Sequence, residues 1–574
     1  MEKPRIGIYV CWCGTNIAKM VDVESVAEEM KKIHNVVVSK NYKYMCSDPG
    51  QDLIINDIKE HNLNRIVVSA CSPRIHELTF RNTLKKAGLN PYMVQMANIR
   101  EHVSWVHISK TASTDKARAL VAAAISRINH HEPLEERTVD IDPATLVIGG
   151  GISGISSALE IADAGKKVYL VEKSVKLGGH TAEIDLTYPY LDSAKQLIDP
   201  MIERVENNEN IDLFLETEVE EITGYIGNFE TTLTPKNGEE PKKVTFGNII
   251  VAIGLKTYDP TPLSNYGYGK LPNVITSAEF EKRLKSGKIV KKDGTVPKKV
   301  AIIHCVGSRN EDYHEYCSRI CCTVALKYAN QIRSALPKAS IYELIADMRS
   351  MSKGCEELYT ITSRKKVAFT MFDQVDGMPE ILEADAKDDC EMIIRVDETR
   401  ARKTLEIPAD LVILMVALEA REKAKEVSHT VGVSLDGNQM FIEKHPKLDP
   451  VATTTGGVYI VGGCASPKDI PDSISQARAA SARILGTIAK GTATVASTTA
   501  YVNEMLCCGC TMCVSICPYV AISFDEERNK SVINEVLCQG CGTCVALCRP
   551  KAINIHGCSH YQMMAELNEL LLTE

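Results

Sequence analysis

The chain has 574 residues, a formal net charge of −8 at pH 7, 44% hydrophobic and 24% charged residues. A domain usually holds about 100–200 residues, so this length predicts several globular domains. The mixed charges give no basic patch for nucleic acid, no apolar run approaches the roughly 18 residues of a membrane span, and the N-terminus lacks an export signal. We therefore expect a cytoplasmic protein, in which the 21 cysteines serve metal binding rather than disulfides.

Residues 1–135 alternate strand-like and helix-like segments, which predicts a small parallel α/β domain. The expected strands are residues 5–10, 36–39, 42–45 and 65–70. Four cysteines follow these strands: Cys11, Cys13, Cys46 and Cys71. Because parallel strands end at one crevice, the four indicate a metal cluster, although isolated cysteines also serve as small core residues. His76, His102 and His107 are alternative ligands, but we favour surface positions for them.

A glycine-rich turn follows a strand-like segment at residues 146–148. Gly149, Gly151 and Gly154 fit G-x-G-x-x-G, and a helix, a second strand at residues 167–171 and Glu172 come next. In this motif the backbone and the helix N-terminus bind a pyrophosphate, and the acidic residue accepts from ribose hydroxyls. The pattern predicts a dinucleotide-binding fold.

Three later segments resemble the FAD-binding parts of flavoproteins with two dinucleotide domains: KLGGHTAEI from Lys176, NIIVAIG from Asn248, and VYIVGGCASPKDIPDSISQARAA from Val458, whose helix would begin near Ser473. They predict a discontinuous FAD domain at residues 140–298 and 436–498. The expected FAD contacts are Gly149, Gly151, Ile152, Ser153, Gly154, Glu172, Lys173, Gly178, Gly179, His180, Thr181, Ala252, Gly254, Gly462, Gly463, Cys464 and Ile474. Lys468 and His180 are candidates for tuning the flavin. Cys464 is a candidate redox group, although a small buried residue is the favoured interpretation.

In such flavoproteins a second Rossmann domain for NAD(P)H interrupts the FAD domain, here at residues 299–435. A strand at residues 299–305 and a helix at 316–336 are expected again, but the loop between them holds one glycine. Instead Cys305 ends the strand, and Cys317, Cys321 and Cys322 lie on the expected first turns of the helix, with Cys317 and Cys321 one turn apart. A helix N-terminus favours thiolates, so we predict a cluster in place of the nucleotide. The alternative is buried structural cysteines with a redox-active pair.

Residues 500–558 contain two runs of C-x2-C-x2-C-x3-C, the first followed by Pro518 and the second by Arg549 and Pro550. In bacterial two-cluster ferredoxins the fourth cysteine of each run binds the other cluster. The predicted ligands are Cys507, Cys510, Cys513 and Cys548 for one [4Fe-4S] cluster, and Cys538, Cys541, Cys544 and Cys517 for the other. A zinc ribbon, which needs only four ligands, is the alternative. The helix-like residues 559–574 fit either partner docking or ordinary packing.

The ordered motifs VCWCG, MCSDPGQ, ACSPRIHE, NIREHVSWVH, GGGISG, HCVGSRN, YCSRICC and the twin ferredoxin runs resemble the A subunit of methanogen-type heterodisulfide reductase, over essentially the whole chain. The resemblance implies an α/β fold with a thioredoxin-reductase-like core and a C-terminal α+β ferredoxin domain. It implies FAD-based electron bifurcation between ferredoxin and the CoM-S-S-CoB heterodisulfide. The implied partners are the B and C subunits and a hydrogenase or formate dehydrogenase with its delta electron-transfer subunit, around a homodimeric core.

One stretch departs from the family pattern. Longer members insert a further two-cluster ferredoxin module, but residues 224–247 here are short and contain no cysteine. We therefore expect four [4Fe-4S] clusters, and five cysteines have no cluster partner by spacing: Cys355, Cys390, Cys464, Cys508 and Cys558. The open alternatives are a sulfate-reducer or acetogen complex with another acceptor, an NAD(P)H-dependent disulfide reductase, and a passive electron wire.

Overall fold

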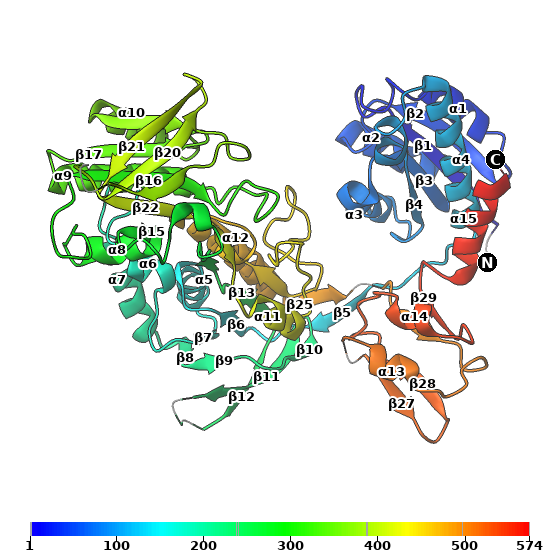
Figure 1. Ribbon diagram of the computed structural model, residues 1–574. Helices are drawn as coiled ribbons and strands as arrows, with labels where there is room; N and C mark the ends of the chain where they lie inside the picture. The colour runs from blue at the N-terminus through cyan, green and yellow to red at the C-terminus, as the bar shows by residue number, and fades with distance from the viewer. Residues whose placement is uncertain are drawn as a thin grey trace. The chain divides into compact units, whose positions relative to one another are not determined.

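The computed structural model describes residues 3–236, 238, 240–385, 389–495, 497–519 and 521–572 (Figure 1). The chain forms two compact units. The first contains Met1–Val139, His445–Leu448 and Thr494–Glu574, and the second contains Asp140–Lys444 and Asp449–Ala493. None of the helices in the described part of the chain is both long and apolar enough to cross a bilayer.

A four-stranded parallel sheet organises the N-terminal residues of the first unit, in the order β2-β1-β3-β4. Its strands are β1 (Ile6–Cys11), β2 (Val36–Tyr42), β3 (Arg65–Ala70) and β4 (Val94–Asn98). Its helices are α1 (Val23–Met30), α2 (Asp48–His61), α3 (Pro73–Lys86), the π-helix η1 (Arg100–Ser104) and α4 (Lys110–Ile128). The parallel α/β prediction is confirmed.

The strand predicted at residues 42–45 is wrong. Strand β2 already runs to Tyr42, which pairs with Cys11 at the end of β1, so the residues beyond have no neighbouring strand to pair with. They form a turn, closed by bonds from the backbone N–H and the hydroxyl of Ser47 to the carbonyl oxygen of Tyr44. Cys46 still follows β2, but from this turn.

Residues 500–558 of the first unit, called the ferredoxin-like part after the prediction made for them, contain two short antiparallel strand pairs and two short helices. These are β26 (Ala500–Val502) with β29 (Ile553–Ile555), β27 (Ile522–Asp525) with β28 (Lys530–Ile533), α13 (Met512–Ile516) and α14 (Thr543–Leu547). The terminal helix α15 (His560–Leu572) packs on α4, where Arg127 pairs with Glu566 at 2.7 Å. This contact favours ordinary packing for the C-terminal helix, whose residues 573 and 574 lie outside the described residues.

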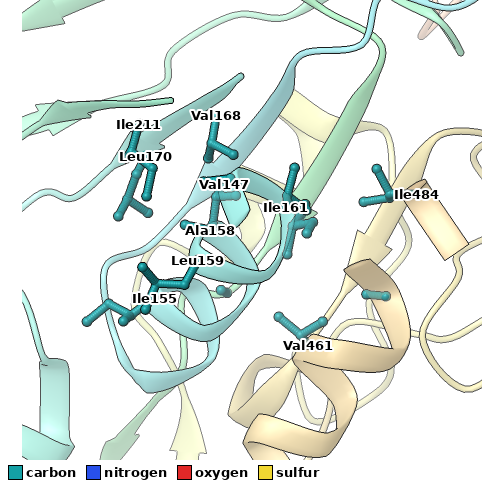
Figure 2. Packing of buried hydrophobic residues seen from close by; sticks show 14 of the residues in the cluster. Val147, Ile155, Ala158, Leu159, Ile161, Val168, Leu170, Ile211, Val461 and Ile484 are labelled. Carbon is teal, nitrogen blue, oxygen red and sulfur yellow. The ribbon is translucent and has the colours of Figure 1, made fainter. Parts of the chain in front are cut away.

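The second unit contains two five-stranded parallel sheets. The first, in the order β24-β13-β6-β7-β8, carries the glycine-rich turn. Its strands are β6 (Thr145–Ile148), β7 (Val168–Val171), β8 (Ile211–Phe214), β13 (Asn248–Val251) and β24 (Val458–Ile460). Val147 of β6 packs with Ile155 and Leu159 of α5 (Ile152–Asp163), all at most 3% exposed (Figure 2).

Helix α12 (Ile470–Lys490) packs against α5 and begins one turn before the predicted start at Ser473. The side chain of Asp469 accepts from the backbone N–H of Asp472 at 2.8 Å, and Pro471 lies in the first turn. Both residues are typical of a helix start.

The second sheet has the order β15-β22-β16-β17-β18. Its strands are β15 (Val274–Thr276), β16 (Lys299–Val306), β17 (Ser340–Ile345), β18 (Val367–Met371) and β22 (Leu411–Val416). The helices around it are α8 (Ser277–Lys285), α9 (Cys321–Ala335) and α10 (Cys355–Arg364), and an antiparallel sheet is formed by β19 (Glu380–Glu383), β20 (Met392–Glu398) and β21 (Lys403–Ala409). Both Rossmann-like halves are thus present.

The predicted start of the helix after β16 is wrong by five residues. Helix α9 begins at Cys321, so Cys317 lies in the preceding loop and not one helical turn from Cys321. Arg319 has a φ of +65°, which breaks a helix at that point. The hydroxyl of Ser318 accepts from the backbone N–H of Leu418, in β23 (Leu418–Ala420), and this anchors the loop.

Shorter elements complete the two units. They are β5 (Arg137–Asp140), α6 (Gly179–Glu183), α7 (Ala194–Glu206), β9 (Thr217–Glu218), β10 (Thr223–Tyr225), β11 (Asn228–Pro235), β12 (Lys242–Phe246), β14 (Leu255–Thr257), η2 (Ser264–Tyr266), α11 (Ala424–Val431), η3 (Gly462–Cys464) and β25 (Thr492–Val495). Strands β10, β11 and β12 form an antiparallel sheet, so the stretch where the family resemblance places an extra module is a small sheet here.

Candidate cofactor sites

The glycine-rich turn joins β6 to α5 with little room between them. A Cβ on Gly154 would lie 1.8 Å from the carbonyl oxygen of Gly149, so only glycine allows this approach. A Cβ on Gly151 would meet no protein atom within 4 Å, and no side chain caps the N-terminus of α5 that begins there. The first backbone N–H groups of α5 therefore face an open space, which fits the pyrophosphate of a dinucleotide.

The other segments predicted to contact FAD converge on this turn. The backbone N–H of Gly178 donates to the carbonyl oxygen of Gly150 at 2.8 Å. A Cβ on Gly462 would lie 2.1 Å from the hydroxyl of Ser153, and a Cβ on Gly149 would lie 2.5 Å from the carbonyl oxygen of Ala252. The remaining predicted residues lie in the same segments: Ile152, Lys173, Gly179, Thr181, Gly254, Gly463 and Ile474.

Glu172 is held by two backbone donors. Its Oε2 accepts from the N–H of Gly150 at 2.6 Å and its Oε1 from the N–H of Ser174 at 2.8 Å. These bonds orient the carboxylate at the end of β7, beside the turn. Its remaining lone pairs fit the expected ribose hydroxyls.

The three candidate catalytic side chains have different surroundings. His180 is half exposed, with Nε2 2.8 Å from the carbonyl oxygen of Leu255 and Nδ1 3.0 Å from Glu183. Burial lowers the pKa of Lys468, whose ammonium lies 2.5 Å from the hydroxyl of Ser466. Burial raises the pKa of Cys464 to about 11, and its thiol donates to backbone carbonyls, which favours a structural role.

The cysteines of the inserted domain gather at the carboxyl end of β16. Burial and the neighbouring Cys322 thiol raise the pKa of Cys305 to about 12, with Cys317 close enough to contribute. The fourth thiol, Cys321, is half-buried and lies beside the other three, and burial and its neighbours raise its pKa as well. The structure thus brings all four predicted ligands together.

Two polar pairs that the sequence analysis missed adjoin this set. Arg309 reaches Cys305 Sγ from 3.9 Å and is paired with both carboxylate oxygens of Asp347. His304 and Glu343 are fully buried, with Nε2 and Oε2 3.1 Å apart. Although burial opposes it, the His304 ring lowers the pKa of Cys322. The alternation of β16 carries no signal for either pair, since their partners lie more than thirty residues away.

The N-terminal cysteines form a second such set at the ends of β1, β2 and β3. Burial raises the pKa of Cys71 to about 12, and the nearby Cys13 and Cys11 thiols add to the shift. Burial and the Cys13 thiol raise the pKa of Cys46 above that of a free thiol. The backbone N–H groups of Cys13 and Met45 donate to Cys11 Sγ at 3.3 and 3.5 Å. All four predicted ligands are neighbours here as well.

Of the three predicted histidine alternatives, His102 is exposed, and the other two have polar partners outside the cysteine set. His76 Nδ1 lies 3.3 Å from the hydroxyl of Thr79, and His107 Nδ1 lies 2.9 Å from the carbonyl oxygen of Val103. The missed residue at this set is Arg100, in η1 after β4, with Nη1 3.4 Å from Cys13 Sγ. The motif NIREHVSWVH contains it, but only the fold brings it to the cysteines.

The cysteines of the ferredoxin-like part are grouped across the two runs. A hollow is lined by Cys507, Cys510, Cys513 and Cys548, with the exposed Cys508 also at its edge. Burial and the thiols of Cys538, Cys541 and Cys517 raise the pKa of Cys544 to about 11. The fourth cysteine of each run therefore joins the other run, which fits the interleaved arrangement of two clusters and not a single zinc site.

Comparison with known proteins gives related chains of similar length. Residues 143–303 match the family model described as pyridine nucleotide-disulphide oxidoreductase. The A subunit of the H(2):CoB-CoM heterodisulfide,ferredoxin reductase of Methanothermobacter thermautotrophicus is 38% identical, covering 92% of this chain and 91% of its own. The A subunit of the H(2)/formate:CoB-CoM heterodisulfide,ferredoxin reductase of Methanococcus maripaludis is 35% identical, covering 92% of both chains.

Two further matches complete the comparison. An Archaeoglobus profundus protein, named for its likeness to the A subunit of heterodisulfide reductase, is 34% identical, covering 99% of this chain and 98% of its own. Among solved structures, Lactococcus lactis thioredoxin reductase aligns with a TM-score of 0.41 and 15% identity, covering 61% of this chain and 100% of that chain.

Proposed function

The chain belongs to the family of heterodisulfide reductase A subunits and is an oxidoreductase, and we propose that it is the electron-splitting subunit of a heterodisulfide reductase complex. It binds FAD and four [4Fe-4S] clusters and divides electron pairs between ferredoxin and the CoM-S-S-CoB heterodisulfide. The observation that carries this proposal is the gathering of sixteen cysteines into four sets of four, one of them at the carboxyl end of β16. In two-dinucleotide flavoproteins a nucleotide turn occupies that position.

The residues around the glycine-rich turn support the FAD part of the proposal. The open space before Gly151 receives the pyrophosphate, and Glu172 receives the ribose. The flavin supplies the exchange between two-electron and one-electron transfer, which clusters alone do not provide. His180 and Lys468 lie in the segments that adjoin the flavin and orient or charge its surroundings.

The names of two relatives support the proposed partners in part. The Methanococcus maripaludis protein is named for hydrogen or formate, for CoB-CoM heterodisulfide and for ferredoxin. We propose that this chain likewise works with the B and C subunits, with a hydrogenase or formate dehydrogenase and its delta subunit, and with ferredoxin. The disulfide of the heterodisulfide is reduced on the B subunit, and the core of the complex contains two copies of this chain.

A self-contained NAD(P)H reductase is the weaker alternative. The loop from 307 to 320 has a single glycine, and the match to the pyridine nucleotide family model ends at residue 303, before that loop. A Cβ on this glycine, Gly307, would lie 2.5 Å from the ring of Tyr258, so the aromatic side chain fills the space beside it. These features support a cluster site in this loop.

The test has two parts: iron and flavin are counted per chain in this chain purified anaerobically by itself, and the native complex is then assayed. About sixteen irons and one FAD are expected, since each cluster holds four irons. Cys322→Ala should lose about four irons, whereas the matched Cys558→Ala should lose none. Hydrogen or formate should then reduce ferredoxin only while heterodisulfide is present. Uncoupled ferredoxin reduction, or rapid flavin reduction by NADH in the isolated chain, would refute the proposal.

A further inference from the structure

An arginine contacts one cysteine of the N-terminal set directly. Arg100 Nη1 lies 3.4 Å from Cys13 Sγ, and its Nη2 donates to Glu101 Oε1 at 2.8 Å. The guanidinium also lies over the ring of Trp105, 4.7 Å from its centroid. The carboxylate and the ring therefore hold a largely buried positive charge against a thiol.

The set in the second unit has the same arrangement. Arg309 Nη1 lies 3.9 Å from Cys305 Sγ, and Asp347 accepts from both Nη atoms at 2.5 and 3.0 Å. Among the described residues, Cys13 and Cys305 are the cysteines with a positive φ, +50° and +57°. Such a backbone is uncommon for a cysteine and is kept where surrounding contacts impose it. Each of the two units thus contains a cysteine with a left-handed backbone conformation that contacts an arginine, and a carboxylate holds that arginine in place.

The ferredoxin-like part treats its cysteines differently. The backbone N–H groups of three alanines donate to sulfur at 3.2–3.3 Å: Ala500 to Cys538, Ala521 to Cys517, and Ala552 to Cys548. The ammonium of Lys530 donates to the carbonyl oxygen of Cys507 and not to its sulfur. Neutral donors therefore serve these sulfurs, whereas charged donors serve Cys13 and Cys305.

Reduction adds an electron to a cluster, so a positive charge or a hydrogen bond at its sulfur stabilises the reduced form. We propose that Arg100 and Arg309 raise the reduction potentials of the clusters held by the N-terminal and inserted-domain cysteines. This inference rests on the proposed function, because it requires those two clusters. It makes both arginines tuning residues and divides the four clusters into two that carry a guanidinium and two that do not.

The test is an EPR-monitored redox titration of the full chain with substitutions of opposite charge effect. Arg100→Gln and Arg309→Gln should each lower the reduced-to-oxidised ratio of one component about tenfold at a fixed potential, a shift of about 59 mV for one electron. Glu101→Gln and Asp347→Asn leave the arginine but remove its counter-charge, so they should shift the same components upward. Each introduced amide keeps an acceptor oxygen for the guanidinium, so these two substitutions should leave the arginine in place.

The matched controls are Arg118→Gln, whose arginine binds Glu29 and Asp115, and Arg204→Gln, whose arginine binds Asp163. Neither should shift any component. Iron is counted in every sample, so wild-type protein without these clusters refutes the proposed function and the tuning with it. If the variants keep the wild-type iron content and neither the arginine nor the carboxylate substitutions shift the potential of any component, the tuning is overturned. If an arginine-to-glutamine variant loses its cluster, the variant of the neighbouring carboxylate, Glu101→Gln or Asp347→Asn, becomes the test for that site. An unchanged potential in that variant overturns the inference for the site.

Discussion

Gly151 offers a direct test of where the dinucleotide lies. Its φ of −80° and ψ of −176° are accessible to any residue, and an added Cβ meets no protein atom within 4 Å. Gly151→Ala should therefore leave folding unchanged. A pyrophosphate seated on the N-terminus of α5 would collide with the new methyl group and lose one charge-assisted hydrogen bond. Such a bond contributes about 1.5–3 kcal/mol, so FAD should bind about 10- to 150-fold more weakly.

Two other glycines give this experiment its controls. Gly154→Ala places a Cβ 1.8 Å from the carbonyl oxygen of Gly149, so the turn itself must move. Stability should fall by at least about 1–3 kcal/mol, together with flavin binding. Gly486 lies within α12 with no atom near its added Cβ. Gly486→Ala should retain FAD and gain about 0.5–1 kcal/mol.

The assay is fluorescence titration of flavin-depleted protein with FAD, with thermal unfolding measured on the same samples by circular dichroism. Gly151→Ala should combine a wild-type unfolding profile with weakened binding, a combination that general destabilisation does not produce. Wild-type affinity in this variant would refute the position inferred for the pyrophosphate. Iron content should stay at the wild-type level, because no cysteine set includes this turn.

Three further outcomes are expected. Burial lowers the pKa of His131 to about 4, from 6.5 for a free histidine. Below pH 6.5 this histidine therefore binds a proton in the unfolded chain but not in the folded chain. The free energy of unfolding should fall by about 2 kcal/mol from pH 7 to pH 5. His131→Asn should abolish this fall in urea unfolding followed by tryptophan fluorescence, and an unchanged pH dependence would contradict it. Lys327 and Glu281 form a buried ion pair at 2.8 Å. Lys327→Met should lower the free energy of unfolding, measured by circular dichroism, by about 3–5 kcal/mol, and adding Glu281→Leu should restore most of it. If the effects of the two substitutions simply add, the two side chains are not paired. Cys517→Ser should remove the same EPR component as Cys541→Ser, although the two belong to different runs, while Cys508→Ser should remove none.

The sequence pattern was sufficient for the parallel sheets and the glycine-rich turn because both depend on local signals. Buried strands such as β6 and β22 appear in the sequence as apolar runs. The turn appears as glycines at a fixed spacing, because a Cβ there would clash with the backbone. The expected strand at residues 42–45 failed because its β-forming side chains say nothing about whether a neighbouring strand exists. Strand β1 ends at Cys11, which pairs with Tyr42, so the residues after Tyr42 have no strand to pair with.

The start of α9 was missed for a related reason. Apolar spacing alone extends that helix back to residue 316, but the loop is fixed from outside by the bond between Ser318 and the backbone of Leu418. The arginines at the cysteine sets are a second kind of omission. Arg100 lies 87 residues from Cys13 in the chain, so spacing gives no signal for their contact. Local patterns point to the candidate ligands, whereas a contact such as that of Arg100 with Cys13 depends on the fold.

The cluster that we propose at the cysteine set beside α9 would replace a nucleotide by a metal without a change of fold. The sheet still ends in a crevice and a helix still begins there, but four cysteines now lie around it, and burial raises the pKa of Cys305 to about 12 and that of Cys321 as well. A metal bound here would make the four thiols release their protons, because it replaces the solvation that each thiolate loses. The charged groups at this edge, Arg309 with Asp347 and His304 with Glu343, would then compensate the charge of an anionic centre.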